Sequence, residues 1–431
     1  MSKFQIVVLA VFILFIIVGV GAFATFKGTS TAGDIPAITM WGTFPKEVLS
    51  QYVSKINQDL DHPITVNYTQ FTDADFSDAF IAALARGNGP DAILISSEMI
   101  LPHEDKLALI PYTALSQRDF LNTYIEEGGT YVSQNGLLAI PFTVDPLIMY
   151  WNRDTFDAAG IAVYPKYWDE YQNLTKKLTV KDANGNIRKS AISMGIFSNL
   201  THAREIFGTL MLQLGNPVTR ANKDGLIEST VKTSFDPSPE SAVQFFTRFS
   251  NPSDPFYSWN RSLIDSKSAF LSGTLATYFG FASELNDIRS KNPNLNFDAA
   301  PMPQLRSGGV KATYGKMFGL SITRASANPN AVYQVISILT DPNNLKNLSN
   351  TLYLPNVRRD IIAETSADPY IQSFNESALI SRSWLEADPI RSNAILSQMI
   401  ESYISSQKTL NQAIQDAGDQ YDSLLMSVQK Q

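Results

Sequence analysis

The sequence of 431 residues contains no cysteine. Disulfide bonds, thiolate metal sites, cysteine nucleophiles and lipid attachment through cysteine are therefore excluded. Histidine is also scarce, with three scattered residues, His62, His103 and His202. Because none of them stands at the spacing of metal ligands, we expect no zinc or non-haem iron site. We also expect no cofactor. The formal net charge of −7 excludes a nucleic-acid binder that relies on a basic surface.

The common sequence signatures of catalysis are missing too. The patterns G-x-S-x-G, G-x-x-x-x-G-K and H-E-x-x-H do not occur, so we do not expect an enzyme. A pair of carboxylates acting as acid and base would leave no such pattern, and the 41 Asp and Glu residues offer many pairs. An exported carbohydrate-active enzyme that uses a carboxylate pair therefore stays open as an alternative.

One long hydrophobic run is present, at the N-terminus. Residues 4–26 carry no charge and lie between Lys3 and Lys27, and about 20 apolar residues cross the hydrocarbon core of a bilayer. We predict an uncleaved transmembrane signal-anchor, with a secretory signal cleaved near Ala22–Ala24 as the alternative. The positive charge before the run predicts that everything after it lies on the extracytoplasmic side of the cell membrane. Residues 27–36 are mostly small and polar, which predicts a flexible tether.

The remaining chain has ample material for a folded core. Hydrophobic residues make up 44% of the sequence, and the length fits two or three domains. Residues 38–42, 64–68 and 91–95 have the composition of strands, whereas residues 45–56 and 76–85 carry apolar positions three and four apart. This alternation of strand and helix predicts an α/β fold with a parallel sheet.

A second region begins after residue 142. It predicts a strand at residues 147–151, a helix that begins at residues 165–170, and a turn between two strands at residues 182–186. A further helix is expected to begin at residues 238–240, and the final helices at residues 393–429.

Aromatic and small polar residues gather where the predicted strands end. Residues 41–44 (WGTF) and 96–98 (SSE) follow two of these strands, and Asp145 follows an apolar run. Ligands of open α/β sheets bind outside the carboxyl ends of the strands. An aromatic face covers the apolar face of a sugar ring, while carboxylates and amides bind its hydroxyls. The pattern therefore favours a carbohydrate site.

An ordered series of short motifs extends this interpretation. The motifs are ITMWG (38–42), AALARGNGPDA (82–92), AIPF (139–142), YWNRD (150–154), AG (159–160), YPKYWDE (164–170), AFLSGTLA (269–276), FGF (279–281), APMP (300–303), YGKMFG (314–319) and LPNVR (354–358). The series resembles the maltose-binding-like sugar family, the extracellular solute-binding proteins of ABC importers, from about Ile38 to the C-terminus. Thr277, Phe281 and Tyr314 depart from the residues common in that family, so the resemblance does not specify the ligand's size or identity.

The resemblance implies a two-lobed α/β fold of the periplasmic-binding-protein type (type II), preceded by the transmembrane helix. The first lobe would comprise residues 37–144 and about 299–346, and the second lobe residues 145–298 and about 347–431. The chain would cross between the lobes near residues 144–146, 301–303 and 347–352. Family members that are anchored by lipid carry a cysteine after the signal, so its absence here supports a transmembrane anchor.

The resemblance also implies a ligand site between the lobes. The expected ligand-binding residues are Trp41, Thr43, Phe44, Ser96, Glu98, Asp145, Trp168, Phe197, Asn199, Phe279, Phe281, Tyr314, Met317, Arg358 and Trp384. For Arg358 an ion pair that braces a lobe is the favoured interpretation, and we assign Asp91 and Trp151 to structure.

The function implied is that of a membrane-tethered extracellular substrate-binding protein. It would capture a carbohydrate in the cleft between the lobes and deliver it to the permease subunits of an ABC importer. We expect a monomer that binds no nucleic acid. A sensor that binds ligand without transport is a further alternative.

Overall fold

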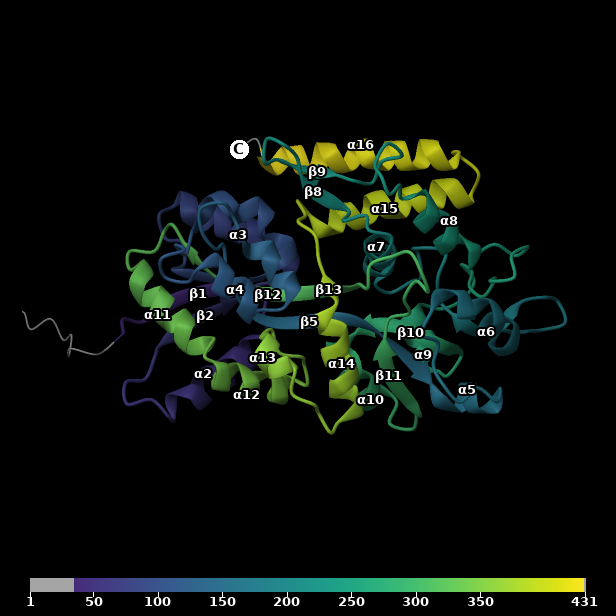
Figure 1. Cartoon of the computed structure of the whole chain (residues 1–431), viewed down its shortest axis with the longest axis horizontal. Coiled ribbons are helices and arrows are strands. Elements are labelled where there is room, and N and C mark those ends of the chain that lie inside the picture. The colour runs from purple at the N-terminus through teal and green to yellow at the C-terminus, as the bar shows by residue number, and fades with distance from the viewer. Residues whose placement is uncertain (1–34, 430–431) are drawn as a thin grey trace, which may run out of the picture.

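The computed structural model describes residues 35–429. Two α/β lobes lie side by side, and long strands run from one lobe into the other (Figure 1). The predicted two-lobed α/β fold is confirmed, and a sheet of 11 strands passes through both lobes, with the main order β2-β1-β3-β12-β5-β10-β7-β6. The predicted signal-anchor, residues 4–26, and most of the tether, residues 27–36, lie outside the described residues. Within residues 35–429, no helix is both long and apolar enough to cross a membrane.

The first lobe contains the predicted alternation of strands and helices. Strand β1 (Ile38–Gly42) pairs in parallel with β2 (Val66–Gln70) on one side and with β3 (Ala92–Ser96) on the other. Helix α2 (Lys46–Asn57) joins β1 to β2, and α3 (Asp73–Ala85) joins β2 to β3. All five residues of β3 are buried, as its continuous apolar run requires. The predicted elements of this region are confirmed.

Other elements complete the first lobe around the same core. They are the short helices η1 (Ser97–Met99), η2 (Leu101–Lys106) and η3 (Glu126–Tyr131), strand β4 (Leu107–Ala108), and helices α4 (Gln117–Thr123), α11 (Pro329–Leu339), α12 (Pro342–Leu352) and α13 (Arg359–Ile362).

Two long strands connect the lobes. Strand β5 (Ile140–Asn152) pairs with β12 (Thr313–Thr323) through its first half. Its second half pairs with β10 (Leu275–Phe281) and β11 (Phe297–Pro301). Strand β12 also pairs with β3 of the first lobe. The two lobes therefore share a continuous hydrogen-bonded backbone, and their relative position depends on the middle of β5 and β12.

The second lobe surrounds the far half of β5. Its strands are β6 (Val180–Lys181), β7 (Ile187–Ile192), β10 and β11, with a separate hairpin of β8 (Thr219–Ala221) and β9 (Ile227–Ser229). Its helices are η4 (Trp168–Glu170), η5 (Ala282–Glu284), α5 (Arg153–Ala158), α6 (Tyr171–Leu178), α7 (Ala203–Gln213), α8 (Glu240–Arg248), α9 (Ser266–Leu271) and α10 (Leu285–Lys291). The predicted turn at residues 182–186 is confirmed, because it joins the antiparallel pair β6 and β7.

The C-terminal part ends in the predicted pair of helices. Helix α14 (Pro369–Leu379) packs on β11 and β5, and β13 (Ser381–Arg382) then pairs in parallel with β12. Helices α15 (Pro389–Ile404) and α16 (Leu410–Gln429) pack against each other over the second lobe (Figure 1). The chain turns between them at Ser406, whose φ of 58° ends the first helix.

Two local expectations differ from the structure. The helix expected from Pro165 begins only at η4 and α6, because Tyr167 forms a bridge with Gln304 that holds this segment extended. The crossing expected near residues 347–352 falls inside α12, where Leu348 joins the core of β1 to β3. Val357 also belongs to that core, whereas Leu354 belongs to a second-lobe cluster with Ile148 and Tyr150, so this part of the chain packs against both lobes.

Each lobe has its own hydrophobic core. One cluster lies around β1, β3 and α11, and another lies around β5, β7, α7 and α16. Asp91 has the predicted structural role, since its carboxylate accepts hydrogen bonds from Thr39 and Ser326. Trp151 is a buried residue of the second core and contacts Phe156, as predicted.

Candidate functional site

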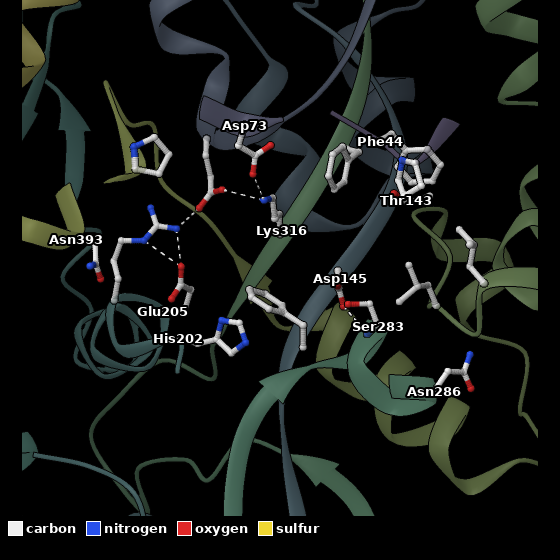
Figure 2. A pocket seen from close by; sticks show the side chains of 18 of the residues that line it. Phe44, Asp73, Thr143, Asp145, His202, Glu205, Ser283, Asn286, Lys316 and Asn393 are labelled. Atoms are coloured by element: carbon white, nitrogen blue, oxygen red, sulfur yellow. Dashed lines mark hydrogen bonds and ion pairs between the residues drawn. The ribbon is translucent and has the colours of Figure 1, made fainter. Parts of the chain in front are cut away.

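A cavity of about 830 Å³ lies between the two lobes, next to the strands that connect them. Its volume lies within the usual range for small-molecule sites, about 300–1,000 Å³. The lining residues are Phe44, Pro45, Asp73, Glu98, Thr143, Asp145, His202, Arg204, Glu205, Phe281, Ser283, Asn286, Lys316, Phe318, Thr351, Leu352, Leu354, Pro389, Ile390 and Asn393. Figure 2 shows polar side chains from both lobes directed toward this space.

The ends of the strands place the first of these residues. Phe44 follows β1 and Glu98 lies in η1 directly after β3. Phe281 ends β10, and Ser283 follows it in η5. Because ligands of open α/β sheets bind at the carboxyl ends of strands, the cavity occupies the place that this architecture favours.

Three phenylalanine rings supply aromatic surface to the cavity. The rings of Phe44 and Phe318 meet edge to face with centroids 5.5 Å apart. Phe281 lies on the second lobe, with its ring 4.8 Å from the imidazole of His202. These rings come from both lobes and from a connecting strand, so a ligand in the cavity would contact apolar surface from more than one side.

Arg204 of α7 is the most buried cation of the cavity wall. Its guanidinium binds Glu98 of the first lobe, Glu205 at 2.7 Å and Glu386 at 2.6 Å. Arg204 is 5% exposed and Glu386 is fully buried. Because Glu98 and Arg204 belong to different lobes, this ion pair joins the lobes across the cleft.

Glu98 is held by two hydrogen-bond donors and a nearby cation. Besides Arg204, the hydroxyl of Tyr314 donates to its carboxylate, and the Lys316 ammonium lies 3.7 Å away. Burial alone would raise the pKa of Glu98, but the two cations and the hydroxyl lower it to about 2. Glu98 is therefore ionised throughout the physiological pH range.

Lys316 extends from β12 into the cavity. Its ammonium pairs with Asp73 of the first lobe at 3.1 Å, as Figure 2 shows. Burial opposes its charge, but Glu98 and Asp73 outweigh burial and raise the pKa of Lys316. The side chain is thus a permanent cation with two carboxylate partners.

Asp145 has a different environment. It lies on β5 between the lobes, and its carboxylate accepts a hydrogen bond of 3.0 Å from the backbone N–H of Ser283 (Figure 2). Burial raises the pKa of Asp145 to about 6, and the donors at Ser283 only partly compensate.

Four of the residues expected from the sequence line the cavity together: Phe44, Glu98, Asp145 and Phe281. Tyr314 and Trp384 lie directly behind it. Their rings are 4.9 Å apart, and each is 5.8 Å from the Arg204 guanidinium. They support the arginine instead of lining the cavity.

The other expected residues do not line the cavity. Trp168, Phe197 and Phe279 are buried in the second core, and Met317 is buried in the first. The Trp41 ring packs against the ring of Phe71, with centroids 4.9 Å apart and planes tilted by 45°.

Four expected residues have structural surroundings of other kinds. The hydroxyls of Thr43 and Ser96 are buried and make no hydrogen bond within the described part of the chain. Asn199 binds the backbone carbonyls of Asn260 and Leu263. Arg358 forms an ion pair with Asp360 at 2.9 Å, and this contact lies within one lobe.

Several cavity residues were not expected from the sequence. Ser283 and Asn286 follow the end of β10, so the rule of strand ends could have indicated them. Asp73 likewise follows β2 by three residues. Arg204 lies on a helix and carries no such sequence signal, because only the tertiary fold places it opposite Glu98.

Metal binding has no support among the described residues. Within residues 35–429, no three His, Asp or Glu side chains are grouped to hold a metal ion.

The fold and the cavity define a class of protein: a two-lobed α/β binding protein with its site between the lobes. The chain belongs to the bacterial extracellular solute-binding proteins, whose family model matches residues 51–372. A comparison with curated proteins gives no match.

Solved structures of sugar-binding proteins have the same fold. The sugar-binding protein MalE from Xanthomonas citri is 17% identical with a TM-score of 0.73, over 92% of this chain and 98% of that chain. A cyclo/maltodextrin-binding protein complexed with maltotetraose is 14% identical with a TM-score of 0.72, over 90% and 96%. CpMnBP1 with mannotriose bound is 19% identical with a TM-score of 0.67, over 89% and 99%.

Proposed function

We propose that this protein captures a carbohydrate in the cavity between its lobes and delivers it to an ABC importer. The observation that carries the proposal is the composition of the cavity wall. Three phenylalanine rings adjoin side chains that bind hydroxyl groups, including Asp145, Ser283 and Asn286. The similar structures with maltotetraose and mannotriose support the same ligand class.

The test is thermal unfolding of the full chain with a panel of mono- and oligosaccharides. A ligand present at about 100 times its dissociation constant adds roughly 2.7 kcal/mol to the free energy of unfolding. At least one sugar is therefore expected to raise the unfolding midpoint. If only a peptide, a polyol phosphate or a metal complex raises it, the carbohydrate proposal is wrong.

Phe281→Ala should weaken sugar binding at least tenfold, about 1.4 kcal/mol, because the ring lines the cavity. Phe245→Ala is the matched control. Phe245 is another partly buried phenylalanine of the second lobe, and it packs on Trp168 away from the cavity. The control should lose stability but keep its affinity, measured by titration calorimetry.

We further propose that residues 4–26 tether the binding domain to the membrane. The full chain should sediment with membranes, whereas a chain that begins after residue 34 should stay in the supernatant. Equal partitioning of the two chains would contradict the tether.

Delivery to a permease distinguishes this proposal from a sensor. Cells that lack the protein should lose uptake of the sugar that it binds, and the full chain should restore uptake. Unchanged uptake in those cells would favour a sensor.

The surroundings of Glu98 support binding over catalysis. One of its oxygens accepts from both Arg204 and Tyr314, so the carboxylate is already engaged. An enzyme should release reducing sugar and lose this activity in Glu98→Gln or Asp145→Asn. We expect no release from the unaltered protein.

A further inference from the structure

The charged side chains of the cavity are not balanced. Four carboxylates line it, from Asp73, Glu98, Asp145 and Glu205, against two permanent cations, Arg204 and Lys316. An excess of carboxylates in a cleft with low-dielectric walls concentrates a negative potential there. The cavity should therefore favour a positively charged ligand over a negatively charged one.

Neither cation is free to bind an anionic ligand. Arg204 already contacts Glu98, Glu205 and Glu386. Lys316 lies between Asp73 at 3.1 Å and Glu98 at 3.7 Å. A ligand carboxylate or phosphate would have to break one of these pairs and leave a carboxylate without its partner, which is costly in a buried site.

Asp145 differs from the other three carboxylates of the cavity, which each pair with Arg204 or Lys316. Within residues 35–429, no lysine, arginine or histidine nitrogen forms an ion pair with it, and the backbone N–H of Ser283 donates to it at 3.0 Å. Lys316 is its neighbour across β5 and β12 in register, but Figure 2 shows that the ammonium is directed to Asp73 instead. Asp145 thus lines the cavity without an ion pair of its own.

Aromatic surface lines the same cavity as this carboxylate. Phe281 comes two residues before Ser283, the donor to Asp145, and both residues line the cavity. A cation over an aromatic face is attracted by the negative potential of the ring, and the attraction is stronger where water is excluded. A carboxylate beside an aromatic face is a favourable setting for an ammonium group.

We propose that the carbohydrate bound here is an amino sugar, whose protonated amino group pairs with Asp145 while its ring contacts the phenylalanines. The inference rests on the proposed carbohydrate-binding function and specifies the ligand class of the same cavity. A neutral sugar would leave Asp145 without a counter-charge, and a uronic acid would meet the excess of carboxylates.

The test is calorimetric titration of the full chain, near pH 7, with sets of sugars that differ at one substituent. Each set holds the hydroxyl, N-acetyl and free-amino forms of one sugar, and the uronic acids of glucose, mannose and galactose are titrated beside them. The sets are those of glucose, mannose and galactose, together with cellobiose, diacetylchitobiose and the glucosamine disaccharide. In the sets that bind, the free-amino form should bind at least tenfold tighter than the other two. This preference should shrink as salt is added, because ions screen the attraction.

Asp145→Asn should remove the preference, leaving the amino and hydroxyl forms within about threefold of each other. Asp169→Asn is the matched control, because Asp169 is an exposed carboxylate of the same lobe that pairs with Arg306 outside the cavity. The unfolding midpoint without ligand reports whether either variant is folded. If a variant does not fold, the ranking of the sugars by the unaltered protein still tests the inference.

The possible results separate the two proposals. If neutral or N-acetylated sugars bind as tightly as the amino forms, the amino-sugar inference is wrong and the carbohydrate function stands. If uronic acids bind most tightly, the inference is also wrong. If no sugar of these sets binds but another sugar of the wider panel raises the unfolding midpoint, only the amino-sugar inference fails. If no sugar of the wider panel binds either, both proposals fail.

Discussion

At the scale of single residues, Arg204 is the cation that pairs with the buried carboxylates behind the cavity. It is the shared partner of Glu98, Glu205 and Glu386, and two rings, Tyr314 and Trp384, flank it. Such a centre is a poor source of net stability compared with apolar packing, but removing one partner is expensive. Its value here is that it fixes the position of Glu98 relative to the second lobe.

Arg204→Ala should lower the free energy of unfolding by about 3–5 kcal/mol, because buried carboxylates lose their partner. Arg220→Ala provides the control. Arg220 pairs with Glu228 at 2.9 Å but is 53% exposed, so its loss should cost about 1 kcal/mol or less. Urea unfolding measures both. Equal midpoints for the two variants would contradict the central role of Arg204.

Glu127 gives a residue-scale prediction for pH dependence. It is buried near the connecting strand β12, Ser381 donates to it at 2.6 Å, and burial raises its pKa to about 7. The charged and titratable groups around it are Arg382, Glu98 and Tyr131. The folded protein therefore keeps a proton on Glu127 that the unfolded chain releases near pH 4.

The stability from this proton is fully present below about pH 4 and is lost as the pH rises through the folded pKa near 7, a loss of about 3 kcal/mol. Glu127→Gln should flatten this decline in the free energy of unfolding and leave the variant more stable above pH 7. Glu364→Gln changes an exposed carboxylate and should keep the decline. A steeper decline in Glu127→Gln would overturn the assignment. Urea unfolding across this pH range measures it.

At the scale of elements, the first turn of α15 links helix capping to the cavity. The carboxylate of Asp388 accepts from the backbone N–H groups of Ile390 and Arg391 at 2.9 and 3.1 Å. Pro389, Ile390 and Asn393 of the same turn line the cavity. The capped turn therefore forms part of the wall that a ligand would touch.

Asp388→Ala should lower the free energy of unfolding by about 1 kcal/mol and weaken ligand binding severalfold, because the first turn of α15 frays. Asp368→Ala removes the equivalent cap of α14, where Asp368 accepts from Tyr370 N–H, and α14 does not line the cavity. This control should lose similar stability while its affinity stays unchanged. A loss of affinity in both variants would mean that the effect is global and not local to the wall.

At the scale of the whole molecule, the pair of Glu98 and Arg204 is a contact between the lobes across the cleft. Strands β5 and β12 continue through both lobes and form the connection about which closure by a hinge motion would occur. The contact across the cleft should favour a closed arrangement of the two lobes.

Glu98→Ala should open the cleft in the absence of ligand and increase the radius of gyration, measured by small-angle X-ray scattering. Glu205→Ala is the control, because Glu205 contacts Arg204 from the same helix and does not bridge the lobes. Its radius of gyration should equal that of the unaltered protein. An unchanged radius in Glu98→Ala would show that the connecting strands alone hold the lobes closed.

Much of the fold could be predicted because it depends on local patterns. The strands at residues 38–42 and 91–95 and the helices between them are encoded by apolar periodicity, Pro, Gly and capping residues, all of which act within a few positions. The helix expected from Pro165 shows the limit. A contact with Gln304, more than a hundred residues away, holds that segment extended.

The sequence by itself determined the family, the α/β alternation and the strand ends at which Phe44 and Glu98 lie. The strand end expected before Asp145 is absent, because β5 continues through this residue. Only the tertiary structure decided which aromatic residues reach the cavity. Trp168 and Phe279 are aromatic residues like Phe281, and no sequence pattern distinguishes the three. Packing nevertheless buries Trp168 and Phe279 in a core. It also decided that Arg204 meets Glu98, because that contact brings together side chains from two lobes that no local pattern connects.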